Sequence, residues 1–305
     1  MKKTLSGIKK ILRFKVQIIA GLLICTAAVY LFATRLMPQP QPRVDYNRLM
    51  QELQLQADNF RGTSGIMVKD LHTKQQVCIN SESLFPSASL VKIPIMAVVY
   101  EAEKEGKLKL TDEIKLQHRH KSPGSGKLYR TRNGKKFSIK NLVERMVEES
   151  DNTATNMLVE LLGFGYINQK FVEFGLKETD MKRGIMDLKW RDAGIENYTT
   201  PQEMAFILEK IYNKELVSEQ ASIEMLEILK KQKHNDRIPR LLPNDIEIAH
   251  KTGTLRGTIS DVGIVFTSEG DFIICVLTDD IRSNRMAKKF IGKIADWTYQ
   301  FYKKS

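Results

Sequence analysis

The chain has 305 residues, 42% of them hydrophobic, and a formal net charge of +12 at pH 7. This hydrophobic fraction is enough for a folded core and excludes a disordered chain. The positive charge is unevenly placed, because residues 1–43 hold eight Lys or Arg and no Asp or Glu. The other 40 basic and 36 acidic residues nearly balance, so we expect no nucleic-acid binding.

The N-terminus has the pattern of a membrane anchor. Residues 1–15 form a basic flank, and residues 16–34 form an uncharged apolar run that Arg35 closes. About 19 residues come close to spanning the hydrocarbon core of a bilayer, and a basic flank favours the cytoplasmic side. We predict a retained transmembrane signal-anchor at 16–34, with cleavage of this segment as the alternative. The remainder then lies outside the cytoplasm, in the periplasm or at the cell surface.

A Pro/Gln linker over 35–43 precedes a folded domain over 44–305. Apolar periodicity predicts its elements in chain order. A helix at 45–60 is followed by a strand pair at 64–69 and 76–80. A helical region comes next, and it contains a basic, glycine-rich surface excursion over 116–136. Its helices are expected at 89–107, 139–149, 153–162, 166–175, 201–213 and 218–232. Strands at 246–252, 261–267 and 272–278 and a helix at 284–302 complete the chain.

Neither group of strands is large enough to be stable alone, so the two groups must join in one antiparallel sheet. The fold class is therefore α+β: an antiparallel sheet flanked by helices, plus an all-α lobe. This lobe, at about 89–240, is inserted between two parts of the sheet lobe. A cleft between the lobes is the natural place for a site, and we expect a monomer.

The first chemical motif is Ser89-Leu90-Val91-Lys92. Residues i and i+3 share one face of a helix, so the Lys92 amine can lie near the Ser89 hydroxyl and act as its base. A helix N-terminus also favours a developing oxyanion at Ser89. Pro94 removes a helical hydrogen-bond donor, so we expect an irregular first turn. This motif alone is weak, since four such residues occur by chance in many chains.

Two further motifs follow. Ser150-Asp151-Asn152 lies between two predicted helices and, taken alone, is typical of a helix N-cap. Lys251-Thr252-Gly253-Thr254 closes an apolar strand, where a glycine often marks close approach of a backbone or a ligand. The combination and order of S-x-x-K, S-D-N and K-T-G carry more weight than each motif does alone.

Together the motifs resemble those of the serine β-lactamase and penicillin-binding-protein superfamily, and of its class A β-lactamases in particular. The likeness extends to residues 85–92, 149–154 and 199–201, and it covers about residues 44–305. It implies a fold of the β-lactamase and DD-peptidase type. It also implies a serine hydrolase that works through an acyl-enzyme, without a metal or an organic cofactor.

The resemblance assigns roles to individual residues. Ser89 is the nucleophile, Lys92 its base, and Ser150 the relay of a proton to the leaving nitrogen. Asn152 holds the amide side chain of the substrate, and Lys251 and Thr252 bind its carboxylate. The backbone N–H groups of Ser89 and Thr254 form the oxyanion hole beside Gly253. The substrate is then a β-lactam or a peptidoglycan stem peptide.

The loop over residues 182–192 departs from class A enzymes, which carry a Glu followed three and four residues later by Leu-Asn. That Glu activates the water that releases the acyl group, and no such sequence occurs here. Asp187 is the nearest candidate base, and Asp192 and Glu196 are others. Asp is one methylene shorter than Glu, so its reach to the ester is in question. The alternative role of Asp187 is that of a structural loop carboxylate.

Three functions share this apparatus. A class A-like β-lactamase, which hydrolyses the β-lactam ring, is the first expectation. The alternatives are a penicillin-binding D-alanyl-D-alanine peptidase acting on peptidoglycan and a non-catalytic, membrane-bound β-lactam sensor. The anchor and the missing Glu favour a peptidase, whereas residues 1–15 are too short for the output domain of a sensor.

The three cysteines, Cys25, Cys78 and Cys275, fit no zinc or redox spacing. The resemblance implies that the strand holding Gly65–Lys69 lies between the strands of Cys78 and Cys275. Two strand spacings are about 9–10 Å, which is beyond the reach of a disulfide. We therefore expect both to be free thiols.

Overall fold

In the computed structural model the described residues are 45–303, apart from the side chain of Leu188. The predicted anchor at 16–34 and linker at 35–43 lie outside them, so both stay predictions. Between residues 45 and 303, no helix is both long and apolar enough to cross a membrane.

A five-stranded antiparallel sheet forms the centre of the domain, in the order β2-β1-β9-β8-β7. Strand β1 pairs with β9 along its whole length, from Thr63 opposite Asp279 to Asp70 opposite Phe272. This pairing joins the two strand groups across the sequence, and the predicted antiparallel α+β fold is confirmed. The strands are β1 (Thr63–Asp70), β2 (Gln76–Ile79), β7 (Ile248–Leu255), β8 (Thr258–Val265) and β9 (Phe272–Asp279).

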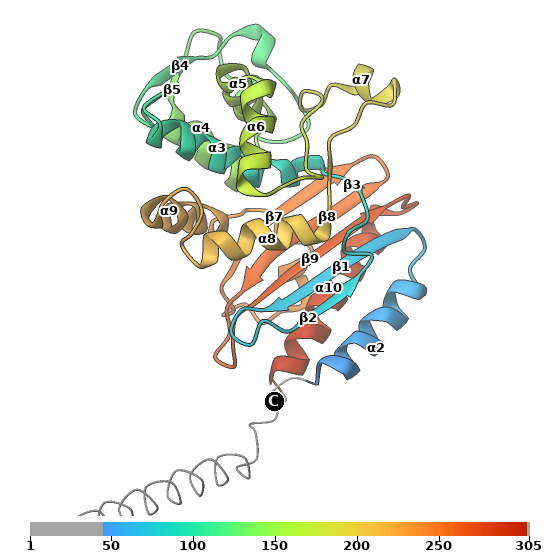
Figure 1. Ribbon diagram of the computed structural model, residues 1–305. Helices are drawn as coiled ribbons and strands as arrows, with labels where there is room; N and C mark the ends of the chain where they lie inside the picture. Colours follow the sequence, from blue (N-terminus) through green and yellow to red (C-terminus); the bar gives the residue numbers. More distant parts are fainter. Residues whose placement is uncertain (1–44, 304–305) are drawn as a thin grey trace, which may run out of the picture. The chain divides into compact units, whose positions relative to one another are not determined.

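Both faces of the sheet are covered (Figure 1). Alternate residues of a strand point to opposite faces, so Phe272 and Ile274 of β9 belong to one apolar cluster and Ile273 and Cys275 to the other. The first cluster is closed by α2 (Tyr46–Asp58) and α10 (Asn284–Lys303). The second extends into the helical lobe, through α8 (Pro201–Tyr212) and α9 (Glu219–Lys230).

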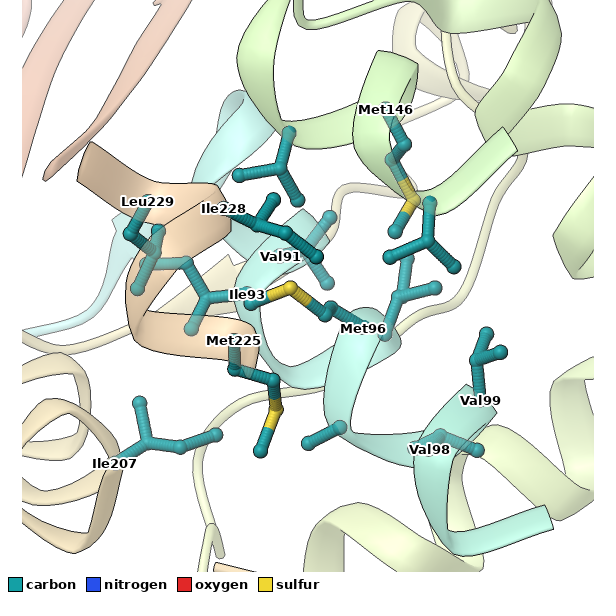
Figure 2. Close-up of a cluster of buried hydrophobic side chains, with 14 of the residues drawn as sticks. Val91, Ile93, Met96, Val98, Val99, Met146, Ile207, Met225, Ile228 and Leu229 are labelled. Carbon is teal, nitrogen blue, oxygen red and sulfur yellow. The ribbon is translucent and has the colours of Figure 1, made fainter. Parts of the chain in front are cut away.

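The centre of the helical lobe is α3 (Lys92–Lys104), which is buried on nearly every side. Figure 2 shows Ile93 and Met96 among side chains of α8, α9 and α4, including Ile207, Ile228 and Met146. Enclosure of this kind fixes the position of the helix, because any displacement would open cavities in a close-packed core. The other helices of the lobe are α4 (Ile139–Glu148), α5 (Asn152–Leu162) and α6 (Phe164–Phe174).

The structure adds detail to three predicted segments. The helix expected from residue 89 begins with a 3-10 turn, η1 (Ala88–Val91), before α3, so the irregular first turn is confirmed. The irregular segment 180–200 contains a short helix, α7 (Leu188–Asp192), and β6 (Tyr198–Thr199), which pairs with β3 (Phe85–Pro86). The excursion over 116–136 holds η2 (His118–His120) and η3 (Leu128–Arg130), and its flanks pair as β4 (Glu113–Lys115) and β5 (Lys136–Ser138).

Strand β1 lies between the strands of the two described cysteines. Met67 stands opposite Cys78 on one side and opposite Cys275 on the other. Both cysteines are free, which confirms the expectation for this pair.

The two ends of the domain meet. Tyr46, at the start of α2, lies with its hydroxyl oxygen 3.0 Å from that of Tyr302, near the end of α10. Both hydroxyls donate to the same oxygen of Asp70, at 2.7 and 3.0 Å. The chain therefore enters and leaves this domain at one place, at the end of the sheet lobe away from the helical lobe (Figure 1).

Candidate active site

Ser89 lies in the η1 turn, at the edge of the sheet beside β7. It is partly exposed and lines a cavity of about 930 Å³. Gly253 of β7 permits this position, because a Cβ there would lie 3.2 Å from the Cβ of Ala88 and 3.3 Å from Cγ of Leu90. The close approach expected at this glycine is therefore to the nucleophile turn. Ala88 adopts φ +48°, a left-handed conformation that costs energy outside glycine.

The Lys92 side chain is completely buried. Its Nζ lies 2.7 Å from the carbonyl oxygen of Ser150, 2.9 Å from Oδ1 of Asn152 and 3.2 Å from Oγ of Ser150. Burial lowers the pKa of this amine to about 7, against the opposing charge of Asp151. A neutral amine has two N–H groups for the two nearer oxygens, which leaves its lone pair free to take a proton from a hydroxyl.

Ser150 connects the two buried lysines. Its backbone is left-handed, with φ +53°, in the short connection between α4 and α5. Lys251 of β7 donates from Nζ to Ser150 Oγ at 3.0 Å and to the carbonyl oxygen of Thr252 at 3.0 Å. Burial lowers the pKa of Lys251 well below its usual range, and the charges of Lys92 and Arg237 lower it further.

Asp151 and Asn152 hold the segment around Ser150. Asp151 is the N-cap of α5 and accepts a hydrogen bond from the backbone N–H of Ala154 at 2.9 Å, as the local sequence predicted. Its other oxygen accepts from the backbone N–H groups of Lys127 and Leu128, at 2.7 and 2.9 Å. Asn152 contacts Lys92 through Oδ1 and donates from Nδ2 to the carbonyl of Pro123 at 2.8 Å.

Arg237 is a candidate binding residue that the sequence motifs did not identify. It is buried, lines the cavity of Ser89, and donates to Thr254 Oγ1 at 2.6 Å and to the carbonyl of Ser260 at 3.1 Å. Its Nε has no hydrogen-bond partner in the described part of the chain, but it lies 3.5 Å from Oδ1 of Asp236. A guanidinium next to the K-T-G strand can receive a carboxylate in two-pronged geometry. No local pattern marks it, because it lies in an irregular segment before β7.

The structure brings Ser89, Ser150, Asn152, Thr252 and Thr254 to one cavity, beneath the helical lobe. Lys92 and Lys251 reach it through Ser150. Asp187 lies elsewhere: it lines a neighbouring cavity of about 480 Å³ and caps α7, accepting from the backbone N–H of Trp190 at 3.4 Å. Its role as a base stays a prediction.

The loop contributes other side chains to the cavity of Ser89. Ile185 and Met186 line it, together with Asp192 and Glu196. Glu196 is buried and engaged by two arginines: Arg183, whose Nε donates to Oε1 at 2.9 Å, and Arg191, whose Nε lies 3.0 Å from Oε2. Asp192 is exposed.

Among residues 45–303, no group of His, Cys, Asp and Glu side chains could hold a metal ion. His118 and His120, spaced like a metal pair, belong to η2. His120 instead lies 3.1 Å from Glu160 through Nε2.

Comparison with known proteins agrees with this geometry. A family model described as "Beta-lactamase enzyme family" matches residues 48–302, and the chain belongs to this family. Beta-lactamase VEB-1 of Pseudomonas aeruginosa is 25% identical over 267 residues, which cover 81% of this chain and 87% of that protein. These relationships define a serine β-lactamase-like hydrolase.

Two solved structures are also similar. A β-lactamase from Sphaerobacter thermophilus DSM 20745 has 30% identity and a TM-score of 0.79, over 85% of this chain and 98% of that one. A mutant of PBP-A, solved as its acyl-enzyme complex with penicillin G, has 26% identity and a TM-score of 0.80. That match covers 88% of this chain and 100% of the PBP-A chain.

Proposed function

We propose that the chain is a penicillin-binding serine peptidase that is acylated at Ser89 by D-alanyl-D-alanine peptides and by β-lactams, and that releases the β-lactam acyl group slowly. The observation that carries the proposal is which side chains of the loop line the cavity of Ser89. A fast β-lactamase needs a free carboxylate against the ester. Here the cavity is lined by Ile185 and Met186, by the exposed Asp192 and by Glu196, which is paired with arginines, whereas Asp187 caps α7 beside the neighbouring cavity.

Acylation uses the groups around Ser150. Neutral Lys92 takes the proton of the Ser89 hydroxyl as Ser89 Oγ bonds to the substrate carbonyl carbon. The backbone N–H groups of Ser89 and Thr254 stabilise the resulting oxyanion. The carbon–nitrogen bond then breaks, and the proton passes through the Ser150 hydroxyl to the leaving nitrogen. Lys251, Thr252 and Arg237 bind the substrate carboxylate, which stem peptides and penicillins share.

Deacylation needs a base that activates a water. Glu196 lines the right cavity, but two guanidinium groups already engage its oxygens. The hydrogen bond from Arg183 and the ion pair with Arg191 hold this carboxylate in place. Asp192 is solvent-exposed and has a short side chain.

A β-lactamase is the second candidate, because Asp192 and Glu196 do line the cavity of Ser89. The experiment that separates the two is intact-protein mass spectrometry of the whole chain over time after addition of penicillin G. The peptidase proposal expects a mass increase of one penicillin that lasts for hours, together with release of D-alanine from a D-alanyl-D-alanine peptide. An adduct that disappears within minutes, with accumulation of hydrolysed penicillin, would favour the β-lactamase. A lasting adduct without peptide cleavage would favour a sensor.

Ser89→Ala should abolish the adduct without unfolding the domain, since few packing contacts are lost. Ser87→Ala is the matched control: its buried hydroxyl has no hydrogen-bond partner in the described residues, so its removal costs little. An adduct that persists in Ser89→Ala would exclude Ser89 as the nucleophile.

A further inference from the structure

The excursion over residues 116–136, called the basic strap below, has no role in the chemistry described above. It contains seven Lys or Arg and no Asp or Glu. Arg119 forms a two-pronged ion pair with Glu160, and Lys136 lies 3.4 Å from Glu113. Among residues 45–303 none of the other five forms a carboxylate ion pair, although Lys127 adds to the charges, chiefly that of Lys233, that lower the pKa of Glu149. Four of the five are exposed. These five are Lys121, Lys127, Arg130, Arg132 and Lys135.

The basic strap is ordered, although five of its seven cations form no carboxylate ion pair among residues 45–303. Leu128 of the strap and Phe137, the residue after its end, are buried in the core of the helical lobe. A positively charged surface that is already ordered attracts a polyanion without the cost of first ordering the segment. An exposed cation that has a carboxylate partner would lose part of this attraction, and most cations of the strap have none.

The basic strap is attached directly to the S-D-N motif. One oxygen of Asp151 accepts from the backbone N–H groups of both Lys127 and Leu128. The Asn152 N–H donates to the carbonyl of Ser125 at 3.2 Å, and a Cβ at Gly126 would lie 2.1 Å from Asp151. Gly124 and Ser125 of the strap line the cavity of Ser89 itself. A polymer bound along the strap would therefore pass the mouth of the active site.

The strap is also far from the chain ends. Tyr46 and Tyr302 meet at the far end of the sheet lobe, whereas the paired flanks of the strap, β4 and β5, lie at the outer end of the helical lobe (Figure 1).

We propose that the basic strap is a docking surface for a peptidoglycan strand, whose repeated stem-peptide carboxylates it binds while one stem enters the cavity of Ser89. This inference rests on the proposed function for the identity of the polymer. The strap contributes binding and alignment, and it takes no part in bond breaking.

The test uses the whole chain in detergent with Ser89→Ala, so that acylation plays no part. Binding to purified sacculi, stripped of phosphodiester polymers by hydrofluoric acid, is measured by sedimentation. Replacing Lys127, Arg130 and Arg132 by Gln should weaken binding about tenfold, an effect that added salt should mimic. The matched control replaces Arg285, Lys289 and Lys293 by Gln. These exposed cations of α10 lie on the other side of the sheet and have no ion-pair partner among the described residues, and this control should bind normally.

Three results would overturn the docking surface. Equal loss in both triple variants would mean that only net charge matters. Undiminished binding of the strap variant, or equal binding to sacculi whose carboxylates have been amidated, would exclude carboxylate recognition by the strap. Displacement from sacculi by micelles doped with an anionic phospholipid, at matched charge, would assign the strap to bilayer headgroups.

Penicillin labelling of the same triple variants, with Ser89 restored, separates this inference from the proposed function. Labelling should be unchanged in both, which also shows that the domain is folded. The unmodified chain could fail to be labelled by penicillin while sacculus binding still depends on the strap. In that case the proposed function fails and the docking surface stands.

Discussion

Lys251 Nζ lies 3.0 Å from Ser150 Oγ, the same atom that lies 3.2 Å from Nζ of Lys92. Two buried ammonium groups on one hydroxyl repel each other, and neither has a carboxylate within ion-pair distance in the described residues. The arrangement is therefore favourable only when at least one of the two amines is neutral. Burial holds the pKa of Lys92 at about 7, so this amine is available as a base near neutral pH.

The pH dependence of acylation tests the role of Lys92 as the base. Burial lowers the pKa of Lys92 to about 7, so the amine is protonated and inactive below pH 7 and neutral above it. The rate constant for penicillin acylation should therefore rise about tenfold per pH unit below 7 and level off above it. Stopped-flow acylation between pH 5 and 9 measures this profile. A rate that is flat from pH 5 to 7 would contradict Lys92 as the base, and Lys92→Gln should show a low rate without the rise.

Asp187→Asn tests the loop carboxylate that the sequence singled out. Asn caps a helix about as well as Asp, so the free energy of unfolding should change by less than about 0.5 kcal/mol. The lifetime of the penicillin adduct should also be unchanged, since Asp187 lines the neighbouring cavity. Asp192→Asn, at the cavity of Ser89, is the comparison. An adduct that lives 10²–10⁴-fold longer in Asp187→Asn would establish Asp187 as the deacylation base.

Arg237→Lys retains the charge but loses the planar fork that binds a carboxylate through two N–H groups. Loss of one charge-assisted hydrogen bond costs about 1.5–3 kcal/mol, which corresponds to a fall in acylation efficiency of roughly 10- to 100-fold. A penicillin methyl ester, which lacks the carboxylate, is the matched substrate: it should react equally with both forms. An equal loss with acid and ester would mean that Arg237 only supports Thr254 and β7.

Gly253→Ala should disturb the nucleophile turn. The added Cβ would lie 3.2 Å from Ala88 Cβ, which is tighter than an ordinary contact, so η1 must shift. We expect acylation to slow at least about tenfold, since small displacements of reacting groups have large effects on rate. Gly165→Ala in α6 is the control, because a Cβ there meets open space. Normal acylation of Gly253→Ala would show that the turn tolerates the displacement.

Most of the fold follows from periodicity. The apolar runs of β7 to β9 and the helical repeats of α3 to α5, α8 and α9 predicted these elements with boundaries close to those observed. The pairing of β1 with β9 followed from the instability of small isolated sheets. Short elements such as α7 and β6 escaped prediction, because five or fewer residues carry no readable period and form only against the rest of the fold.

The site residues likewise fall into those that the sequence could predict and those that it could not. Ser89, Ser150 and Lys251 could be chosen because their motifs occur together in a fixed order. Arg237 and the arginine pair around Glu196 could not, since their positions depend on which irregular segments the fold brings to the cavity. The direction of Asp187 likewise depends on where α7 begins. The composition of the loop does not determine which way a carboxylate in it points.

The hydrogen bonds among Tyr46, Tyr302 and Asp70 hold the two ends of the domain together without a covalent link between them. A short linker from Lys303 back to Asp45 would supply this link, and the backbone could then be opened at an exposed turn such as the one at Gly106, between α3 and β4. In such a circular permutant every contact of Ser89, Lys92 and Ser150 would survive, because none of them depends on where the chain starts. The order of the motifs identifies the site in the sequence, but the chemistry needs only their arrangement in space.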